Sequence, residues 1–190
     1  MRGERAGTPL RPVERGSMAV SLKTPLVLVT DDDLARVSEE NPGYQFERER
    51  DGSVTVSPTS TEGAAKDGEA FAQLYAYAKK VGGKAFGSSA GFKLDGESIV
   101  KSPDASWVSQ SRIDALTVAE RRVFYPLSPD VAIEVRSPSD SFETTVEKAD
   151  EYIEYGSTYS VAIDPKTRRV VELGAPPAGL TLDFDAIIDA

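Results

Sequence analysis

Charged residues in the second half of this chain have the types and spacing of a site that hydrolyses phosphodiester bonds. Asp104 and Asp130 each follow a proline and precede a run of apolar residues typical of a short strand. Glu134 lies inside the second run, and Lys148 follows on the next predicted helix. Two acids on neighbouring strands could hold a divalent cation that polarises a phosphate and lowers the pKa of bound water, while the ammonium stabilises developing charge. The pattern therefore predicts metal-dependent cleavage of phosphodiester bonds.

The strand predicted over residues 131–135 sets the requirements of this site. Its side chains alternate, so the β-branched residues at odd positions share one face and Glu134 lies on the other. A carboxylate there needs a cation, a metal or a proton, because burying an unpaired charge is costly. Glu134 could also be satisfied by an arginine or by backbone donors, without any chemistry. For Asp130, a cap of the turn before the strand is favoured over a ligand role.

The composition excludes several kinds of catalytic and metal site. The chain contains no cysteine and no histidine, which excludes disulfides, thiol nucleophiles, histidine general bases and zinc sites built from these residues. Carboxylate oxygens instead favour Mg²⁺, Mn²⁺ or Ca²⁺. The net charge of −9 argues against broad nonspecific attraction to nucleic acid, but it leaves room for a local basic groove or for a phosphate contact through a metal.

Length and patterning predict one folded domain. Residues 1–22 look like a tail, with arginines, glycines and prolines scattered through them, and residues 23–190 suffice for a single domain with its own core. The sequence shows no apolar run of about 18 residues and no secretory signal pattern. We therefore expect a cytoplasmic protein without a membrane segment.

Turn signals and hydrophobic periodicity divide the chain into the elements that must position the acids and the lysine. A helix is expected after the Thr30 cap, a hairpin around Asp51 and Gly52, and a polar loop over residues 58–68. The other expected elements are helices over residues 69–81 and 141–155, strands over 84–87, 91–94, 99–101, 105–108, 131–135, 159–163 and 169–173, a helical or irregular stretch over 111–126, and a short final element ending at 188.

Sequence motifs around the candidate residues carry a resemblance to a known family. The segments SPDASWVSQSRIDAL, SPDVAIEVRSPSDS, EKADEYIEYGS and VAIDPKTRRVVEL resemble the Uma-two family of restriction endonucleases, within the PD-(D/E)XK nuclease superfamily, over about residues 41–175. The resemblance implies an α/β fold of the restriction endonuclease-like type, with a mixed central sheet flanked by helices. It also implies a Mg²⁺-dependent nuclease, with Mn²⁺ as a substitute ion, that acts on DNA and often forms a homodimer.

The resemblance assigns roles to particular residues. Asp104 and Glu134 match the two acidic metal ligands, and the Val135 carbonyl is a plausible third ligand. Lys148 matches the lysine that this family places on the next helix, where it would position the attacking water. Without the resemblance, Lys148 would be interpreted as a surface lysine paired with an acid of its own helix.

Two further assignments follow from the superfamily pattern. Arg136 occupies the usual lysine slot two residues after the acid; an arginine cannot act as a base, so a phosphate contact is expected for it. Glu69, near the start of a predicted helix, matches the place of a further acid that could contact the metal. A solvated acid stabilised by the helix dipole explains Glu69 equally well.

Alternatives to a DNA endonuclease stay open at this point. The chain could be a non-catalytic nuclease-like module that binds nucleic acid or serves assembly, as its acidity and displaced lysine suggest. It could also be a metal-dependent phosphodiesterase acting on a small molecule. A homodimer is expected from the resemblance and from apolar area offered by Trp107 with Phe124 and Tyr125.

Overall fold

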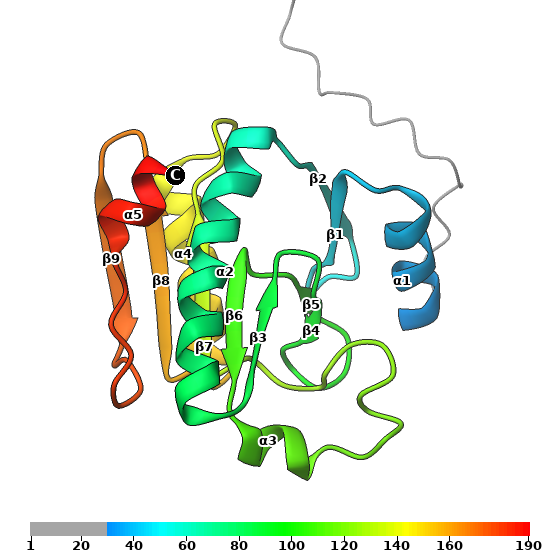
Figure 1. The fold of residues 1–190 in the computed structure, drawn as a ribbon. Helices are drawn as coiled ribbons and strands as arrows, with labels where there is room; N and C mark the ends of the chain where they lie inside the picture. The colour runs from blue at the N-terminus through cyan, green and yellow to red at the C-terminus, as the bar shows by residue number, and fades with distance from the viewer. Residues whose placement is uncertain (1–29) are drawn as a thin grey trace, which may run out of the picture.

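The computed structural model describes residues 30–190, and the tail predicted over residues 1–22 lies outside them. The described chain folds into two sheets with helices around them (Figure 1). This mixed α/β architecture confirms the expected fold class. The helices are α1 (Asp31–Glu40), α2 (Thr61–Val81), α3 (Gln110–Ala115), α4 (Phe142–Glu154) and α5 (Phe184–Asp189). The strands are β1 (Tyr44–Arg48), β2 (Val54–Pro58), β3 (Lys84–Gly87), β4 (Phe92–Lys93), β5 (Val100–Lys101), β6 (Ala105–Val108), β7 (Val131–Val135), β8 (Tyr159–Asp164) and β9 (Arg169–Gly174).

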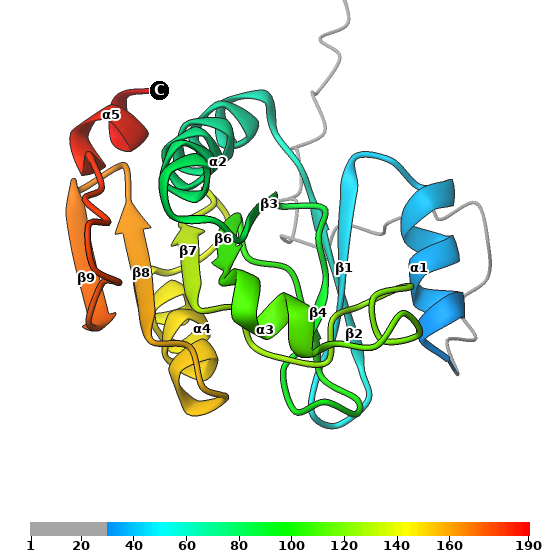
Figure 2. The same ribbon diagram turned by 60° about the horizontal axis from the view of Figure 1, so that its bottom comes forward.

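The larger sheet is the scaffold of the candidate site. Its strand order is β3-β6-β7-β8-β9. β7 and β8 pair in parallel, while the other neighbours pair antiparallel, so the sheet is mixed as expected. Helix α2 covers one face and α4 the other, which is clearest when the molecule is turned (Figure 2). The parallel β7–β8 pair requires a crossover connection, and α4 supplies it.

The smaller sheet lies beside this scaffold and is antiparallel throughout. Its order is β2-β1-β5-β4, and α1 packs against β1. The hairpin of β1 and β2 turns at Asp51 and Gly52, as their turn signal predicts, and Gly52 has a φ of 82° that favours glycine. No helix within residues 30–190 is both long and apolar enough to cross a membrane.

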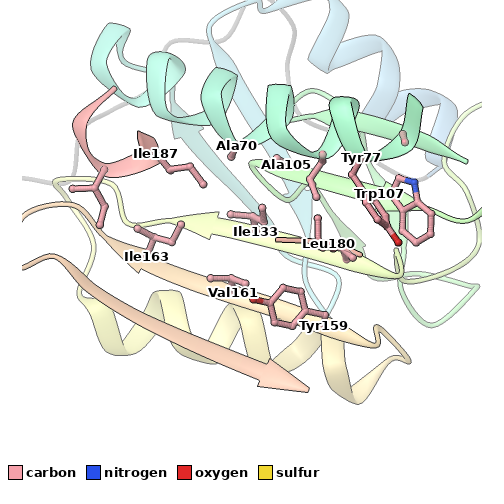
Figure 3. Packing of buried hydrophobic residues seen from close by; sticks show 14 residues of the cluster. Ala70, Tyr77, Ala105, Trp107, Ile133, Tyr159, Val161, Ile163, Leu180 and Ile187 are labelled. Atoms are coloured by element: carbon pink, nitrogen blue, oxygen red, sulfur yellow. The ribbon is translucent and has the colours of Figure 1, made fainter. Parts of the chain in front are cut away.

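The central strand β7 divides its side chains between two cores. Val131 and Ile133 are fully buried against α2, in the cluster shown in Figure 3. Ala132 packs on the opposite face with Tyr152 of α4. The predicted alternation is therefore confirmed, and it places Glu134 on the α4 side of the sheet.

Helix α2 corrects the prediction of a polar loop over residues 58–68. It begins at Thr61, because the side chain of Ser60 accepts a hydrogen bond from the backbone N–H of Gly63 and caps the helix. The glycines of this segment suggested a loop, but their cost within a helix is only about 1 kcal/mol each. The packing of α2 on the larger sheet outweighs that cost, and the helix gains two turns that the sequence pattern did not show.

Trp107 is part of the core and offers little surface to a partner. Its side chain is buried against Tyr77, with ring centroids 5.1 Å apart, and its indole N–H donates to the carbonyl of Gly82. The apolar area expected from Trp107 for a dimer contact is therefore not available, and the part of the dimer argument that rests on Trp107 was wrong.

Candidate active site

Helix α4 holds both oxygens of the Glu134 carboxylate. Glu134 is only 4% exposed; its Oε1 accepts a hydrogen bond of 2.8 Å from the hydroxyl of Tyr152, and its Oε2 lies 3.1 Å from Nζ of Lys148. Lys148 and Tyr152 are four residues apart, one turn along α4, and therefore project from the same side of the helix. The cation that a buried Glu134 requires is thus Lys148, and the tyrosine, which the sequence did not mark for the site, satisfies the other oxygen.

Strand pairing brings Asp104 beside Glu134. Asp104 directly precedes β6, whose antiparallel register sets Ala105 opposite Ile133 of β7. Oδ2 of Asp104 accepts a hydrogen bond of 2.7 Å from the backbone N–H of Val135. Because the N–H and C=O of one strand residue point to the same side in an antiparallel ladder, the Val135 carbonyl also faces the Asp104 side. The two acids and the carbonyl named by the sequence are therefore neighbours.

Glu47 of β1 is a site residue that the sequence pattern did not reveal. It is 7% exposed, and its Oε1 lies 3.0 Å from Nζ of Lys148. The same oxygen accepts a hydrogen bond of 2.7 Å from the backbone N–H of Ser102. Lys148 therefore bridges a carboxylate of each sheet. Within residues 30–190, neither of its ion pairs is with an acid of its own helix.

Asp67 is a second acid that the sequence pattern did not reveal. Burial, followed by the negative charge of Asp104, raises its pKa to about 7, against the opposing attraction of Lys148. Asp67 lies in the two turns of α2 that were predicted as loop. Glu69, the acid proposed from the sequence, instead accepts a hydrogen bond of 3.0 Å from Gln73, which is itself bonded to Asp183 before α5. Of these two acids of α2, Asp67 is thus the one whose pKa responds to the charge of Asp104.

Acidic side chains outnumber basic ones at the site. Burial raises the pKa of Glu134, with Asp104 and Glu47 adding to the effect and Lys148 opposing it. Burial likewise raises the pKa of Asp104. Burial alone would lower the pKa of Lys148, but the surrounding carboxylates raise it well above its ordinary value, so the ammonium stays charged. The site would gain from a further cation.

The donor set fits a hard divalent ion. Carboxylate and backbone carbonyl oxygens are the ligands that Mg²⁺ and Mn²⁺ prefer, and Mg²⁺ commonly keeps several waters. Within residues 30–190, no three carboxylates already stand close enough to hold a metal together. A bound ion would be held by Asp104, Glu134 and the Val135 carbonyl, after Glu134 turns one oxygen away from Lys148.

The Arg136 side chain is bonded to residues that surround the site. Its Nε donates to Asp164 at 2.7 Å, and its Nη1 donates to the backbone carbonyls of Ser137 and Asp140. Asp164 ends β8, the parallel neighbour of β7, and is 4% exposed. The guanidinium thus fastens the end of β7 to the loop that leads into α4.

Asp130 lies at the opposite end of β7 from Glu134. Its Oδ2 accepts a hydrogen bond of 2.7 Å from the backbone N–H of Ser109, and its Oδ1 pairs with Arg112 at 3.2 Å. These contacts stabilise the start of α3. The side-chain bonds of Asp130 thus go to the segment after β6 and to α3, whereas the sequence suggested a cap of the turn before its own strand.

Comparisons with known proteins agree with this architecture. A crystal structure titled as "a putative nuclease belonging to DUF820 from Anabaena variabilis ATCC 29413" matches with a TM-score of 0.59 and 18% identity, over 85% of this chain and 98% of that one. At this identity the match shows the shared fold. No curated protein matches the sequence. The family described as "Putative restriction endonuclease", Uma2, matches residues 31–181. The resemblance carried by the motifs is thereby confirmed, and the chain belongs to the Uma2 family and has a restriction endonuclease-like fold.

Proposed function

We propose that this chain is a Mg²⁺-dependent endonuclease that hydrolyses phosphodiester bonds in DNA. The observation that carries the proposal is the convergence of Asp104 before β6, Glu134 of β7 and Lys148 of the crossover helix within a buried and acid-rich site. Membership of the family described as restriction endonucleases supports the same activity.

Each residue has a distinct part in this proposal. Asp104, Glu134 and the Val135 carbonyl hold Mg²⁺, for which Mn²⁺ can substitute; the bound ion supplies Lewis acidity and a water of lowered pKa. Lys148 donates hydrogen bonds to the attacking water or to the phosphate as negative charge develops. We assign Arg136 a structural part, because its guanidinium is already bonded to Asp164 and to the loop.

Cleavage and metal binding of two matched variants test the proposal. Purified protein with Mg²⁺ is expected to cut plasmid DNA, and single strands and a small phosphodiester serve as comparison substrates. Asp104→Asn should abolish cutting and weaken Mn²⁺ binding in calorimetry by at least about tenfold. Asp130→Asn should bind Mn²⁺ as the parent does, because Asp130 lies at the other end of β7.

The outcomes separate the remaining alternatives. Equal losses of Mn²⁺ binding in both variants would contradict the ligand assignment. Turnover of the small phosphodiester without any cutting of DNA would make the chain a small-molecule phosphodiesterase. DNA binding without cutting of any substrate would make it a binding module.

A further inference from the structure

The contact between Glu47 and Lys148 joins two sheets at the centre of the site. Glu47 belongs to β1 of the smaller sheet, whereas Lys148 belongs to α4, which packs on the larger one. The side chains are 10% and 23% exposed, so the pair is shielded from bulk water. A charge contact in such surroundings is stronger than the same contact on a surface.

Lys148 has two carboxylate partners, and the proposed function removes one of them. Nζ lies 3.1 Å from Glu134 and 3.0 Å from Glu47. When Glu134 turns an oxygen to a divalent ion, the ammonium loses part of that contact and faces a second positive charge. Glu47 is then the carboxylate that can keep the ammonium near the reacting phosphate, and a third N–H is left to donate.

Glu47 is itself fixed by the segment that carries Asp104. The oxygen that contacts Lys148 also accepts the backbone N–H of Ser102, two residues before Asp104. The two groups that contact this oxygen, the Lys148 ammonium and the Ser102 N–H, are both hydrogen-bond donors. The oxygen is therefore placed to accept from the ammonium and to orient it. The Ser102–Asp104 segment thus fixes two acids relative to each other. Asp104 is the proposed metal ligand, and Glu47 is the acid that contacts Lys148.

We propose that Glu47 is a positioning residue that holds Lys148 in place when Glu134 binds the metal. The inference rests on the proposed function. It gives the smaller sheet a part in the chemistry, because β1 supplies the partner without which the ammonium would move away from the site.

Glu49, the residue after the end of β1, provides a control close to Glu47. It lies two residues from Glu47 and pairs with the buried Lys101, which also lies 3.6 Å from Glu151 of α4. Glu49→Gln likewise removes the charge of a glutamate paired with a lysine, but it leaves both carboxylates that contact Lys148 in place. A difference between Glu47→Gln and Glu49→Gln reports on the lysine and not on the general attachment of β1.

Three measurements on the full chain test the proposal. In calorimetry, Glu47→Gln should bind Mn²⁺ within about threefold of the parent, because Glu47 is not a ligand. With Mn²⁺ present, acetylation of Lys148 followed by mass spectrometry should be at least about tenfold faster in Glu47→Gln than in the parent or in Glu49→Gln. Single-turnover cleavage should fall on the order of a hundredfold in Glu47→Gln alone, while DNA affinity in Ca²⁺ stays at the parental value.

Each contrary result has a definite meaning. Loss of Mn²⁺ binding in Glu47→Gln would make Glu47 a ligand and overturn the proposal, as would parental acetylation and cleavage rates or equal losses in both variants. If the parent binds Mn²⁺ but cuts no nucleic acid, the proposed function fails, and the acetylation comparison still tests whether Glu47 holds Lys148. If the parent binds no Mn²⁺, both proposals fail. Should Glu47→Gln not fold, Glu47→Asp replaces it, since its shorter side chain withdraws the carboxylate from Lys148 and should give the same order of rates with smaller differences.

Discussion

At the scale of single residues, Lys148 is the group on which the proposed chemistry depends most. Its ammonium is charged and 3.1 Å from Glu134, so it can donate hydrogen bonds but does not serve as a base. Lys148→Ala should therefore reduce single-turnover cleavage at saturating protein by at least about a hundredfold, with DNA affinity nearly unchanged. Parental cleavage by Lys148→Ala, with its fold verified by circular dichroism, would show that the metal and the acids suffice.

The ion pair of Arg136 and Asp164 predicts a contribution to stability that depends on pH. Although burial opposes the shift, hydrogen bonds from Thr167, Arg136 and the backbone of Lys166 lower the pKa of Asp164 from 3.8 to about 2. A lowered pKa in the folded state means that the contribution is fully present above pH 3.8 and is lost as the pH falls through about 2. Arg136→Ala should accordingly cost on the order of 1–3 kcal/mol of unfolding free energy near neutral pH.

Denaturant unfolding as a function of pH measures this contribution. The difference in stability between the parent and Asp164→Asn should be constant from pH 7 to about 5 and should shrink between about pH 4 and 2. A difference that stays constant down to pH 2 would show that the Asp164 carboxylate is not stabilised by its partners in the folded state.

At the scale of elements, α4 contacts both oxygens of the Glu134 carboxylate, because it carries Lys148 and Tyr152 on the same side. Tyr152→Phe keeps the ring that packs against Ala132 but removes the hydroxyl that donates to Glu134. Leaving a buried acceptor without its donor typically costs about 1–3 kcal/mol, so a modest loss of stability is expected. Because Glu134 also loses an orienting bond, Mn²⁺ binding should weaken by about tenfold or more. Unchanged Mn²⁺ affinity in calorimetry would show that Lys148 alone orients the acid.

The elements around Asp104 and Glu134 could be predicted from sequence because local signals define them. Pro-Asp turns precede β6 and β7, and the Ser141 cap begins α4, so local signals placed the acids on neighbouring strands and Lys148 on the next helix. The resemblance to the family added the choice of Lys148 over Arg136.

The rest of the site depends on contacts between distant parts of the chain. Asp67 was missed because glycines made the first turns of α2 look like a loop, although packing on the sheet keeps them helical. Glu47 stands at an ordinary polar position of an alternating strand, and no local pattern shows its contacts with Lys148 of α4 and with the backbone of Ser102. Arg136 finds Asp164 through the parallel pairing of β7 and β8, which no local pattern shows.

At the scale of the whole molecule, charge works against simple attraction to DNA. The chain carries −9 in total, and part of this charge comes from buried acids of the candidate site. A polyanionic substrate can approach such a site only when a bound cation offsets local charge and when contacts elsewhere contribute. An assembly with two sites would gather more of these contacts than one chain does.

A homodimer is therefore our last prediction. The expectation rests on membership of the family and on the need for two sites to cut both strands of a duplex at one place, and no longer on Trp107. Light scattering at micromolar concentration should give twice the 20.4 kDa mass of one chain. In the plasmid assay, a dimer should produce linear DNA early, whereas independent monomers should accumulate nicked circles first. A mass near that of one chain, together with nicked circles as the main early product, would show that each chain cuts one strand on its own.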